Sequence, residues 1–555
     1  MRPPSIPHVS SRRVCPRVLV VMLLLTPLGG CADAGPVPDA SVGADGSTSD
    51  ATVRDDAATD AAADAGGPPA DQGVDRYVWW EQERARRQAA LDTYLSDNEA
   101  ALRTMLYAPL GGFGVPRRAV DRFSEVMPDI WGPPEEKFAA VGLGPDLYDP
   151  SNPLPLGIAP FRSAGVDYAV IACGTCHVGR VVGPDGVDRL LFGAPNTRMN
   201  AIFNAFEQSA EDSRWNDLGA GIPGATVRTA LQLRRQVEER VLLDFTFSTA
   251  RNANAPDPFA LDRPGYFDSF AVIFAMQTLP EALLPGTDAT LDAIMPPNPA
   301  EADVMSIWLQ RDRPAAEWDG SMPHAVYRNL AASVGAVGFG FAVNFEPSAV
   351  VAEFSRDLPP PPYPFPVDGV RAARGAALFQ GHCATCHHAG ANTVYPPAVT
   401  GTDPNRAHAI TTAGRTRLLQ ALRSACTDST LCAATDAEIL VPVSDPNRLG
   451  YLALPLQGLW ARAPYLHNGS VPTLRHLLVP SSRPASFMRG ATHYNTSDVG
   501  FEWQPSRVND PYAHAYDTTL AGRSNGGHDT LTFLGRDWGS DPEALADLLE
   551  FLKTL

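Results

Sequence analysis

Two short stretches decide the fold of this 555-residue chain: IACGTCHVGR at residues 171–180 and GHCATCHHAG at residues 381–390. Each stretch contains two cysteines three positions apart and a histidine directly after the second one. The residues concerned are Cys173, Cys176 and His177 in the first stretch, and Cys383, Cys386 and His387 in the second. This spacing has three chemical uses, which are zinc binding, a dithiol switch and covalent attachment of haem.

Only one of these uses needs every residue of the motif. A zinc site needs four ligands close together, whereas each motif supplies three and the two motifs lie far apart in the sequence. A thioredoxin-like switch has no need of the histidine. In c-type haem attachment both thiols bond to the porphyrin edge, and the histidine binds the iron as the proximal ligand. We therefore predict two covalent haem c groups, with His177 and His387 as iron ligands. We expect His382 and His388, beside the second motif, at the surface or near a propionate.

The first thirty residues have the order of a secretory signal. A basic flank (Arg12, Arg13 and Arg17) precedes the apolar run 18–25, and LGGC follows at 28–31. This order resembles a bacterial lipoprotein signal, in which Cys31 would be lipidated; an ordinary signal peptide is the alternative. We expect a protein of the bacterial cell envelope, anchored to a membrane by lipid and facing the periplasm or the outer surface. Haem attachment outside the cytoplasm agrees with export.

Residues 31–75 predict a disordered tether. Residues 32–75 carry ten aspartates, one arginine and almost no large apolar side chain, so they cannot offset the entropy of ordering. This segment supplies much of the formal net charge of −18. The acidity argues against nucleic acid as a partner and says little about the active site. Two further cysteines, Cys426 and Cys432, are close together, and in an exported protein they predict a structural disulfide.

The remaining chain predicts a mainly α fold with two cytochrome c-like haem domains side by side and extensive loops. The expected boundaries are 76–356 for the N-terminal haem domain, 357–369 for a stiff proline-rich connector and 370–555 for the C-terminal cytochrome c domain. At the C-terminal end, Ser540 or Asp541 can cap a helix, with Glu543 completing a capping box. Its apolar stripe consists of Leu545, Leu548, Leu549 and Leu552. We expect this helix to pack across the helix that precedes the second motif.

Longer segments add a family resemblance. They are GAPNTR (193–198), RPGYFDSF (263–270), ADVMSIW (302–308), EWDG (317–320), GTDPNRA (401–407), LPLQGLWARAPYLHNGSVPTLRHLLVP (454–480) and SNGGHD (524–529). Together with the two motifs, they resemble the dihaem cytochrome c peroxidase superfamily over residues 80–555. The resemblance is closer to the large-chain branch that includes the dihaem rubber oxygenases.

The resemblance implies that one haem has an open iron face and that the other has two protein ligands. It implies that the N-terminal haem is the open one and that His528 is the second ligand of the C-terminal haem. Met488, the usual kind of ligand in an electron-transfer cytochrome, is a rival candidate. His467, His493 and His514 are further candidates for this position, whereas His476 is expected to be a packing residue. No acidic loop compels a calcium site, although some relatives bind calcium.

Three residues are candidates for the open face of the first haem: Trp308, Trp318 and His324. Trp318 is our candidate catalytic residue, and either tryptophan could instead relay electrons between the haems or pack in the core. The predicted function is an exported dihaem oxidoreductase that activates peroxide or dioxygen at the N-terminal haem, with the C-terminal haem as electron-transfer centre. Its expected partners are a small redox protein and an apolar organic substrate. The alternative is a membrane-tethered electron carrier without catalytic activity.

Overall fold

The computed structural model describes the folded part of the chain in twelve segments. They are residues 77–111, 114–136, 138–238, 301–313, 315–322, 325–337, 343–388, 393–409, 412–427, 449–520, 522–529 and 535–555. The predicted signal peptide, Cys31, the predicted tether, RPGYFDSF, His324 and Cys432 lie outside these residues. Cys426 is disulfide-bonded, as predicted for one half of that pair.

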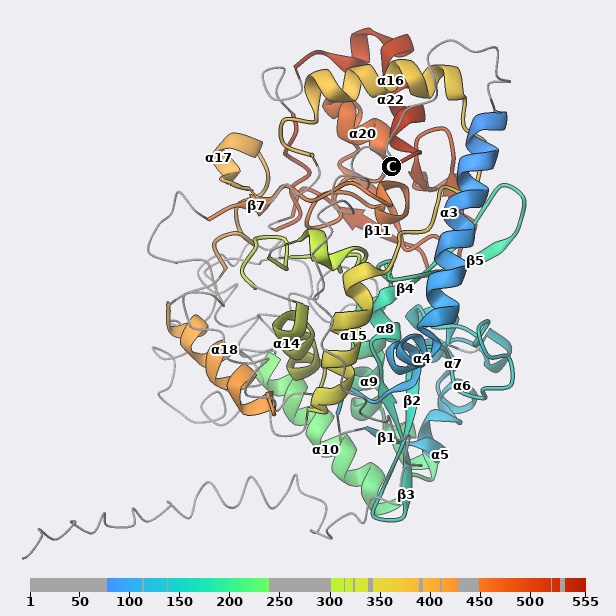
Figure 1. Cartoon of the computed structure of the whole chain (residues 1–555). Helices are drawn as coiled ribbons and strands as arrows, with labels where there is room; N and C mark the ends of the chain where they lie inside the picture. Colours follow the sequence, from blue (N-terminus) through green and yellow to red (C-terminus); the bar gives the residue numbers. More distant parts are fainter. Residues whose placement is uncertain are drawn as a thin grey trace, which may run out of the picture.

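The architecture is mixed and mostly helical, with short antiparallel strands. Figure 1 shows two halves, with α16, α20 and α22 in one and α4, α8, α14 and α15 in the other. The long helix α3 (Val78–Asp97) runs along one side of both halves. We call the halves the N-terminal and C-terminal units. The strands are two to six residues long, which is too short for their alternation to stand out in the sequence.

The N-terminal unit combines helices with three antiparallel strand pairings. Its main helices are α4 (Glu99–Tyr107), α8 (Gly174–His177), α9 (Met199–Glu211), α10 (Gly221–Glu238), α14 (Ala325–Val337) and α15 (Phe345–Asp357). Its strands are β1 (Val115–Pro116), β2 (Ile158–Ser163), β3 (Val166–Ile171), β4 (Val178–Val182) and β5 (Asp188–Phe192). Strand β3 lies between β1 and β2, and β4 pairs with β5. The first cysteine motif therefore sits in the short helix between β3 and β4.

The C-terminal unit is built around a crossing of two helices. Its helices are α16 (Gly369–His382), α17 (Pro397–Thr400), α20 (Leu474–Leu478) and α22 (Pro542–Leu552). Its strands are β6 (Val394–Tyr395), β7 (Tyr451–Leu452), β8 (Ser486–Arg489), β9 (Tyr494–Asn495), β10 (Gly500–Phe501) and β11 (His514–Asp517). Within the described part of this unit they form two-stranded pairs, β6 with β7, β8 with β11 and β9 with β10. Helix α18 (Thr412–Ala425) follows α17 in the sequence but packs against α14 in the N-terminal unit (Figure 1).

The crossing of α16 and α22 follows the sequence prediction. Asp541 caps α22 by accepting a hydrogen bond from Ala544 N–H, and the predicted leucine stripe is buried. The helices come very close at Gly375, where a Cβ atom would lie 2.0 Å from the carbonyl oxygen of Asp547. Phe379 and Phe551 pack beside the crossing, with ring centroids 5.3 Å apart. The last turn of α16 then delivers the second cysteine motif.

The proline-rich connector is extended, and it is packed into the protein rather than exposed. Leu358, Tyr363 and Val367 are almost fully buried. Indole N–H groups of Trp80 and Trp460 donate to the carbonyl oxygens of Phe365 and Pro361, respectively. Because side chains from both units surround it, the connector belongs to a core shared by the two units. Within the described residues, no helix is both long and apolar enough to cross a membrane.

Candidate haem-binding sites

The second cysteine motif presents His387 with one ring nitrogen already engaged. The N–H of His387 donates to the carbonyl oxygen of Cys383, which closes the turn between the two cysteines. Nδ1 of His387 lies 3.1 Å from the carbonyl oxygen of Leu454, to which it can donate a proton. That contact assigns the proton to Nδ1 and leaves Nε2 free as a metal ligand. Burial lowers the pKa of His387, so the imidazole is neutral, as a ligand must be.

His528 faces His387 from a distant part of the sequence. Their ring centroids are 6.2 Å apart and the ring planes are inclined by 20°. A metal–imidazole bond is about 2.0–2.1 Å long and the ring centroid lies about 1.1 Å beyond the nitrogen, so two imidazoles on one ion have centroids about 6.2–6.4 Å apart. Burial is the largest cause that lowers the pKa of His528 to about 3. The pair therefore fits two axial ligands of one haem iron.

The structure does not bring the rival ligands to His387. His467 stacks on Tyr451, with ring centroids 4.3 Å apart. Met488 lies in β8 next to a small cavity of about 10 Å³ that Thr197 and Trp503 also line. The exposed His493 and the β11 residue His514 lie in the loops and strands that follow α20. None of their described contacts is with His387.

The first cysteine motif holds His177 at the end of α8. The N–H of His177 donates to the carbonyl oxygen of Cys173, as in the second motif. Burial lowers the pKa of His177 to about 3, the nearby Arg328 charge lowers it further, and the backbone of Met305 opposes the shift. The described residues place no second imidazole ring in contact with His177. The two motifs thus share the proximal arrangement and differ in what faces the histidine.

The cysteine thiols do not have the character of a dithiol switch. All four motif cysteines are free. Burial raises the pKa of Cys173 to about 12 and that of Cys383 to about 11. A reactive switch cysteine requires a lowered pKa, because the thiolate is the nucleophile. Among the described side chains there is also no group of three or more histidines, cysteines or carboxylates placed to hold a metal ion. Both motifs fit haem attachment better than a zinc site or a dithiol switch.

An internal repeat supplies the backbone segment that lies beside each proximal histidine. Residues 305–323 and 454–472 align without a gap, at a constant offset of 149 (454 − 305). In both copies a two-residue bridge closes the same tight hairpin, Ala316 with Met322 and Tyr465 with Val471. The residue after the first bridge position has positive φ in each copy, 68° at Glu317 and 69° at Leu466. Met305 and Leu454, the backbone neighbours of the two proximal histidines, are therefore equivalent positions.

The two copies also hold each other reciprocally. Asp303 N–H donates to the carbonyl oxygen of His467 at 2.6 Å, and Leu452 N–H donates to that of Trp318 at 2.8 Å. Positions 303 and 452, and likewise 318 and 467, are equivalent in the repeat. Such mutual pairing is the mark of a two-fold relation, here within a single chain. The two copies of the repeat are thus related by a local pseudo-two-fold axis that passes between the two hairpins.

The sequence prediction did not include this repeat, although its signal was present. Only four of the nineteen aligned positions are identical, the pairs Arg313/Arg462, Gly320/Gly469, Ser321/Ser470 and Pro323/Pro472. A search for self-similarity anchored on the two haem motifs could have found it. The repeat shows which residues have diverged: Trp318 stands at the position that His467 occupies in the second copy.

Both candidate tryptophans lie at the interface between the N-terminal and C-terminal units, which we call the seam. Trp318 is partly buried, and its indole N–H donates to the carbonyl oxygen of Asp303 at 2.7 Å. It packs with Met305 and Leu454 in a small apolar cluster. Trp308 is fully buried, donates to the carbonyl oxygen of Phe192, and lies under the Arg462 guanidinium at 5.8 Å. These contacts place Trp308 against both units.

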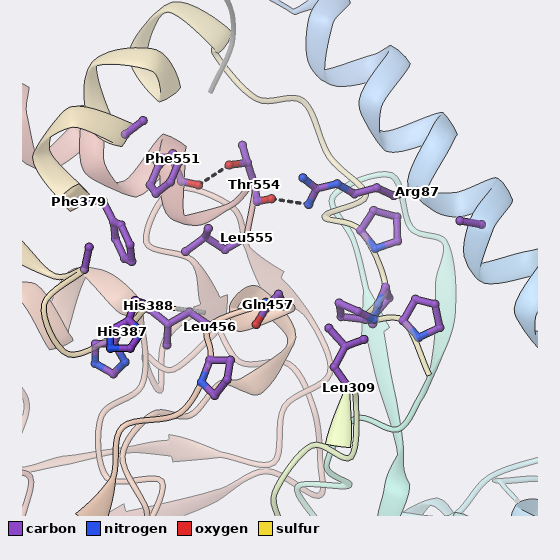
Figure 2. Close-up of a pocket in the computed structure, with 18 of the residues that line it drawn as sticks. Arg87, Leu309, Phe379, His387, His388, Leu456, Gln457, Phe551, Thr554 and Leu555 are labelled. Carbon is purple, nitrogen blue, oxygen red and sulfur yellow. Dashed lines mark hydrogen bonds between the residues drawn. The ribbon is translucent and has the colours of Figure 1, made fainter. Parts of the chain in front are cut away.

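A cavity of about 550 Å³ adjoins His387 on the side of the connector. Figure 2 shows Leu309, Leu456 and Leu555 around it, with His387 and His388 at one side and Arg87 at the other. Arg87 is held there by the carbonyl oxygen of Thr554 at 2.6 Å. Apolar side chains and a space open to solvent therefore lie close to His387 of the second motif.

Two families match separate parts of the chain. Residues 450–488 match the family described as RoxA-like, cytochrome c-like, and residues 104–177 match the Y4iN-like domain. The first match contains the second copy of the repeat, including Leu454. The second match runs from α4 through the first cysteine motif to His177. A cytochrome c-like segment is thus present beside the second motif, which suggests haem c.

Three proteins of Sinorhizobium fredii are similar to parts of the chain. The protein titled uncharacterized protein y4iM is 38% identical over 284 residues, which cover 47% of this chain and 66% of that protein. Uncharacterized protein y4iJ is 37% identical over 111 residues, covering 19% of this chain and 18% of that protein. Uncharacterized protein y4iN is 27% identical over 135 residues, covering 21% and 65%. The chain spans less than two thirds of each of these relatives.

Proposed function

We propose that this protein is a dihaem c-type cytochrome with oxidoreductase activity, in which the two centres have different roles. The observation that carries the proposal is the asymmetry between the motifs. His387 faces His528 at the spacing of two ligands on one ion, whereas no described imidazole faces His177. The second centre is therefore the electron-transfer centre, and the first keeps a face for a small ligand.

Haem c, when bound, supplies an iron that exchanges electrons and, where a coordination position is open, binds peroxide or dioxygen. The chain contributes the rest. Cys173, Cys176, Cys383 and Cys386 attach the two groups, and the carbonyl oxygen of Leu454 holds His387 in the tautomer that presents Nε2. His528 would supply the second ligand at the C-terminal centre and would thereby exclude small ligands there.

Trp308 supports communication between the centres. Its fully buried ring contacts Gly458 of the second copy of the repeat, while its N–H is bound to Phe192 of the first unit. An aromatic ring at this position offers a path for electrons across the seam. Trp318, our sequence-based candidate for catalysis, has its N–H engaged by the backbone of Asp303, so we assign its role to the seam as well.

The proposal extends to the setting of the protein. The signal-like N-terminus and the cysteine motifs support an exported protein of the bacterial cell envelope, held to a membrane through Cys31. Its partners would be a small redox protein and, if the first centre activates dioxygen, an apolar organic molecule. The purely electron-carrying alternative requires a second strong ligand at the first centre.

Carbon monoxide binding to the reduced protein tests the proposal. We expect one carbon monoxide per chain in the unsubstituted protein, because only the first centre is open. His528→Ala should raise this number to two and convert the second centre from low spin to a ligand-binding form in the electron paramagnetic resonance spectrum. Met488→Leu, which removes the rival ligand, should leave both readouts unchanged.

Two outcomes would contradict the proposed function. No carbon monoxide binding by the unsubstituted protein would support the electron carrier instead. An unchanged second centre in the His528→Ala protein would show that His528 is not its ligand.

A further inference from the structure

Two arginines stand at equivalent positions of the repeat, Arg313 and Arg462. They form one of only four identical pairs in the aligned stretch. Arg313 is buried with 7% of its surface exposed, and burial lowers the pKa of Arg462 to about 10. Placing a guanidinium away from water is costly unless its N–H groups are engaged. In each arginine, Nη1 donates to the carbonyl oxygen of the residue seven positions before it.

Arg462 holds both ends of a short loop. Its Nη1 donates to the carbonyl oxygen of Pro455 at 2.8 Å, and its Nη2 donates to that of Gln457 at 2.6 Å. The loop begins directly after Leu454, whose carbonyl oxygen lies 3.1 Å from Nδ1 of His387. The planar fork of the guanidinium therefore fixes the backbone next to the acceptor of the proximal histidine.

Arg313 repeats this contact in the N-terminal unit. Its Nη1 donates to the carbonyl oxygen of Ser306 at 2.8 Å, and its Nη2 lies 3.3 Å from the Ser306 hydroxyl. Ser306 is the equivalent of Pro455, and it directly follows Met305, the backbone neighbour of His177. In both units the arginine reaches back seven residues to the same position.

We infer that Arg313 and Arg462 are positioning residues, one for each haem centre. Arg462 fixes the backbone whose Leu454 carbonyl oxygen accepts the Nδ1 proton of His387, and Arg313 fixes the equivalent backbone at Met305 beside His177. Each thereby sets the reduction potential of its own centre. This inference rests on the proposed attachment of haem at both motifs. A hydrogen bond to Nδ1 makes an imidazole a stronger donor to a metal, which stabilises the ferric state. A buried positive charge acts in the opposite direction, because it favours the state with less positive charge.

Substitution by lysine separates the two effects. Arg462→Lys keeps the charge but cannot hold two carbonyl oxygens in a fixed fork. We expect His387 to become a weaker donor and the potential of the second centre to rise. Arg462→Met also removes the charge, so its potential should lie below that of Arg462→Lys. A tenfold change in the ratio of ferric to ferrous protein corresponds to 59 mV for one electron, and we expect a shift of about this size.

The measurement is a spectroelectrochemical titration of the full-length protein, combined with electron paramagnetic resonance to assign each centre. Arg462→Lys should shift the second centre and leave the first in place, and Arg313→Lys should do the reverse. Arg475→Lys is the control, because Arg475 lies in α20 of the second unit and is paired with Asp498 at 2.7 Å. It should shift neither centre.

A different result is expected if the two arginines contribute only to the general stability of the protein. Each substitution would then lower the free energy of unfolding while leaving both potentials unchanged, or it would shift the potentials of both centres by the same amount. Either result overturns the inference. A haem count below two per chain in the unsubstituted protein would instead count against the proposed function, and it is measured separately with the pyridine haemochrome assay.

Discussion

At the scale of single residues, burial favours the neutral form of several histidines of this protein. Burial is the largest cause of the lowered pKa of His177, His387, His528 and His476. For the first three residues neutrality is what the proposed binding of haem iron would require. His476 shows the same effect without a metal. Its Nδ1 lies 2.6 Å from the Thr473 hydroxyl, and its ring packs edge-on against Trp503 at 4.6 Å. The structure thus places His476 where our packing interpretation expects it.

His476 should make the protein less stable in mild acid. Its pKa is lowered to about 4, whereas that of an unfolded histidine is about 6.5. Between these values the unfolded chain binds a proton that the folded protein excludes, so stability is lost as the pH falls from 6.5 to 4. At about 1.4 kcal/mol per pH unit, the loss is roughly 3 kcal/mol. Urea unfolding of the protein and of the His476→Gln variant should show a difference that shrinks over this range.

Substitution of the exposed His493 by glutamine serves as the control for this experiment. It should leave the pH dependence of the unfolding free energy as it is in the unsubstituted protein. If the difference between the protein and the His476→Gln variant stays constant from pH 6.5 to pH 4, the imidazole of His476 does not titrate as its burial indicates.

At the scale of elements, the crossing of α16 and α22 depends on the absence of a Cβ atom at Gly375. A Cβ atom on Gly375 would lie 2.0 Å from the carbonyl oxygen and 2.7 Å from the carbonyl carbon of Asp547. Both are backbone atoms of α22, so relief requires the helices to separate. Asp547 is also bound by Arg371 and Arg374 of α16, and these ion pairs would be strained by a shift. The geometry of the second motif, at the end of α16, depends on this crossing.

Gly375→Ala should therefore destabilise the protein although alanine favours helix. Overpacking of this kind costs about 1–3 kcal/mol of unfolding free energy. Gly381→Ala is a matched control in the same helix, because a Cβ atom on Gly381 would have open space within 4 Å and the φ of this residue is not positive. That variant should be as stable as the protein or more stable by about 0.5–1 kcal/mol. Equal unfolding free energies for the two variants would show that the crossing is not close.

The elements that sequence could predict are those with a strong local signal. The cap at Asp541 and the leucine stripe of α22 both depend on residues within one short stretch of sequence, and the structure confirms them. The short strands have no such stretch, because two to six residues cannot show a clear alternation. The repeat was hidden for another reason. Its backbone course requires a positive φ at position 317 or 466 and a glycine three residues later, while most other side chains are free to differ.

At the scale of the whole molecule, the two units are joined by buried ion pairs. Each pair has one partner in each unit; the pairs are Arg198 with Asp510, Glu301 with Arg523, Asp303 with Arg489, and Asp319 with Arg406. Tyr516 lies between two of these arginines, with Arg489 at 4.9 Å and Arg523 at 4.6 Å from its ring centroid. Buried pairs of this kind fix how two surfaces meet, because a mismatched partner leaves a charge without compensation.

This seam is the part of the molecule that the sequence could not predict. The two motifs predicted two haem centres, and the connector predicted a boundary between them. They gave no indication that the connector is buried or that the hairpins pair reciprocally across a local axis. His528 shows the same limit at the second site. It follows His387 by 141 residues (528 − 387), and only a family resemblance, not spacing, pointed to it. Contacts between distant segments depend on the packing of the whole chain.

The seam predicts that the two units unfold together. It also predicts that the ion pair between Arg489 and Asp303 contributes to the stability of both units. Arg489 and Asp303 are 1% and 8% exposed and 2.7 Å apart, and Arg489 also donates to the carbonyl oxygens of Asn468 and Gly469. Arg489→Met leaves the carboxylate of Asp303 buried without its partner, so the unfolding free energy should fall by about 3–5 kcal/mol. Adding Asp303→Asn should restore part of this loss, because the second substitution removes the unpaired charge.

The exposed pair of Arg162 and Asp167, 2.9 Å apart, supplies the comparison. Arg162→Met should cost less than about 1 kcal/mol, since exposed ion pairs contribute little. Thermal unfolding followed by circular dichroism and by the absorbance of each centre should give coincident transitions in the protein and in Arg489→Met. Separate transitions for the two centres in the unsubstituted protein would mean that the units are independent domains. In that case the seam would be a contact surface between them and not the core of a single folding unit.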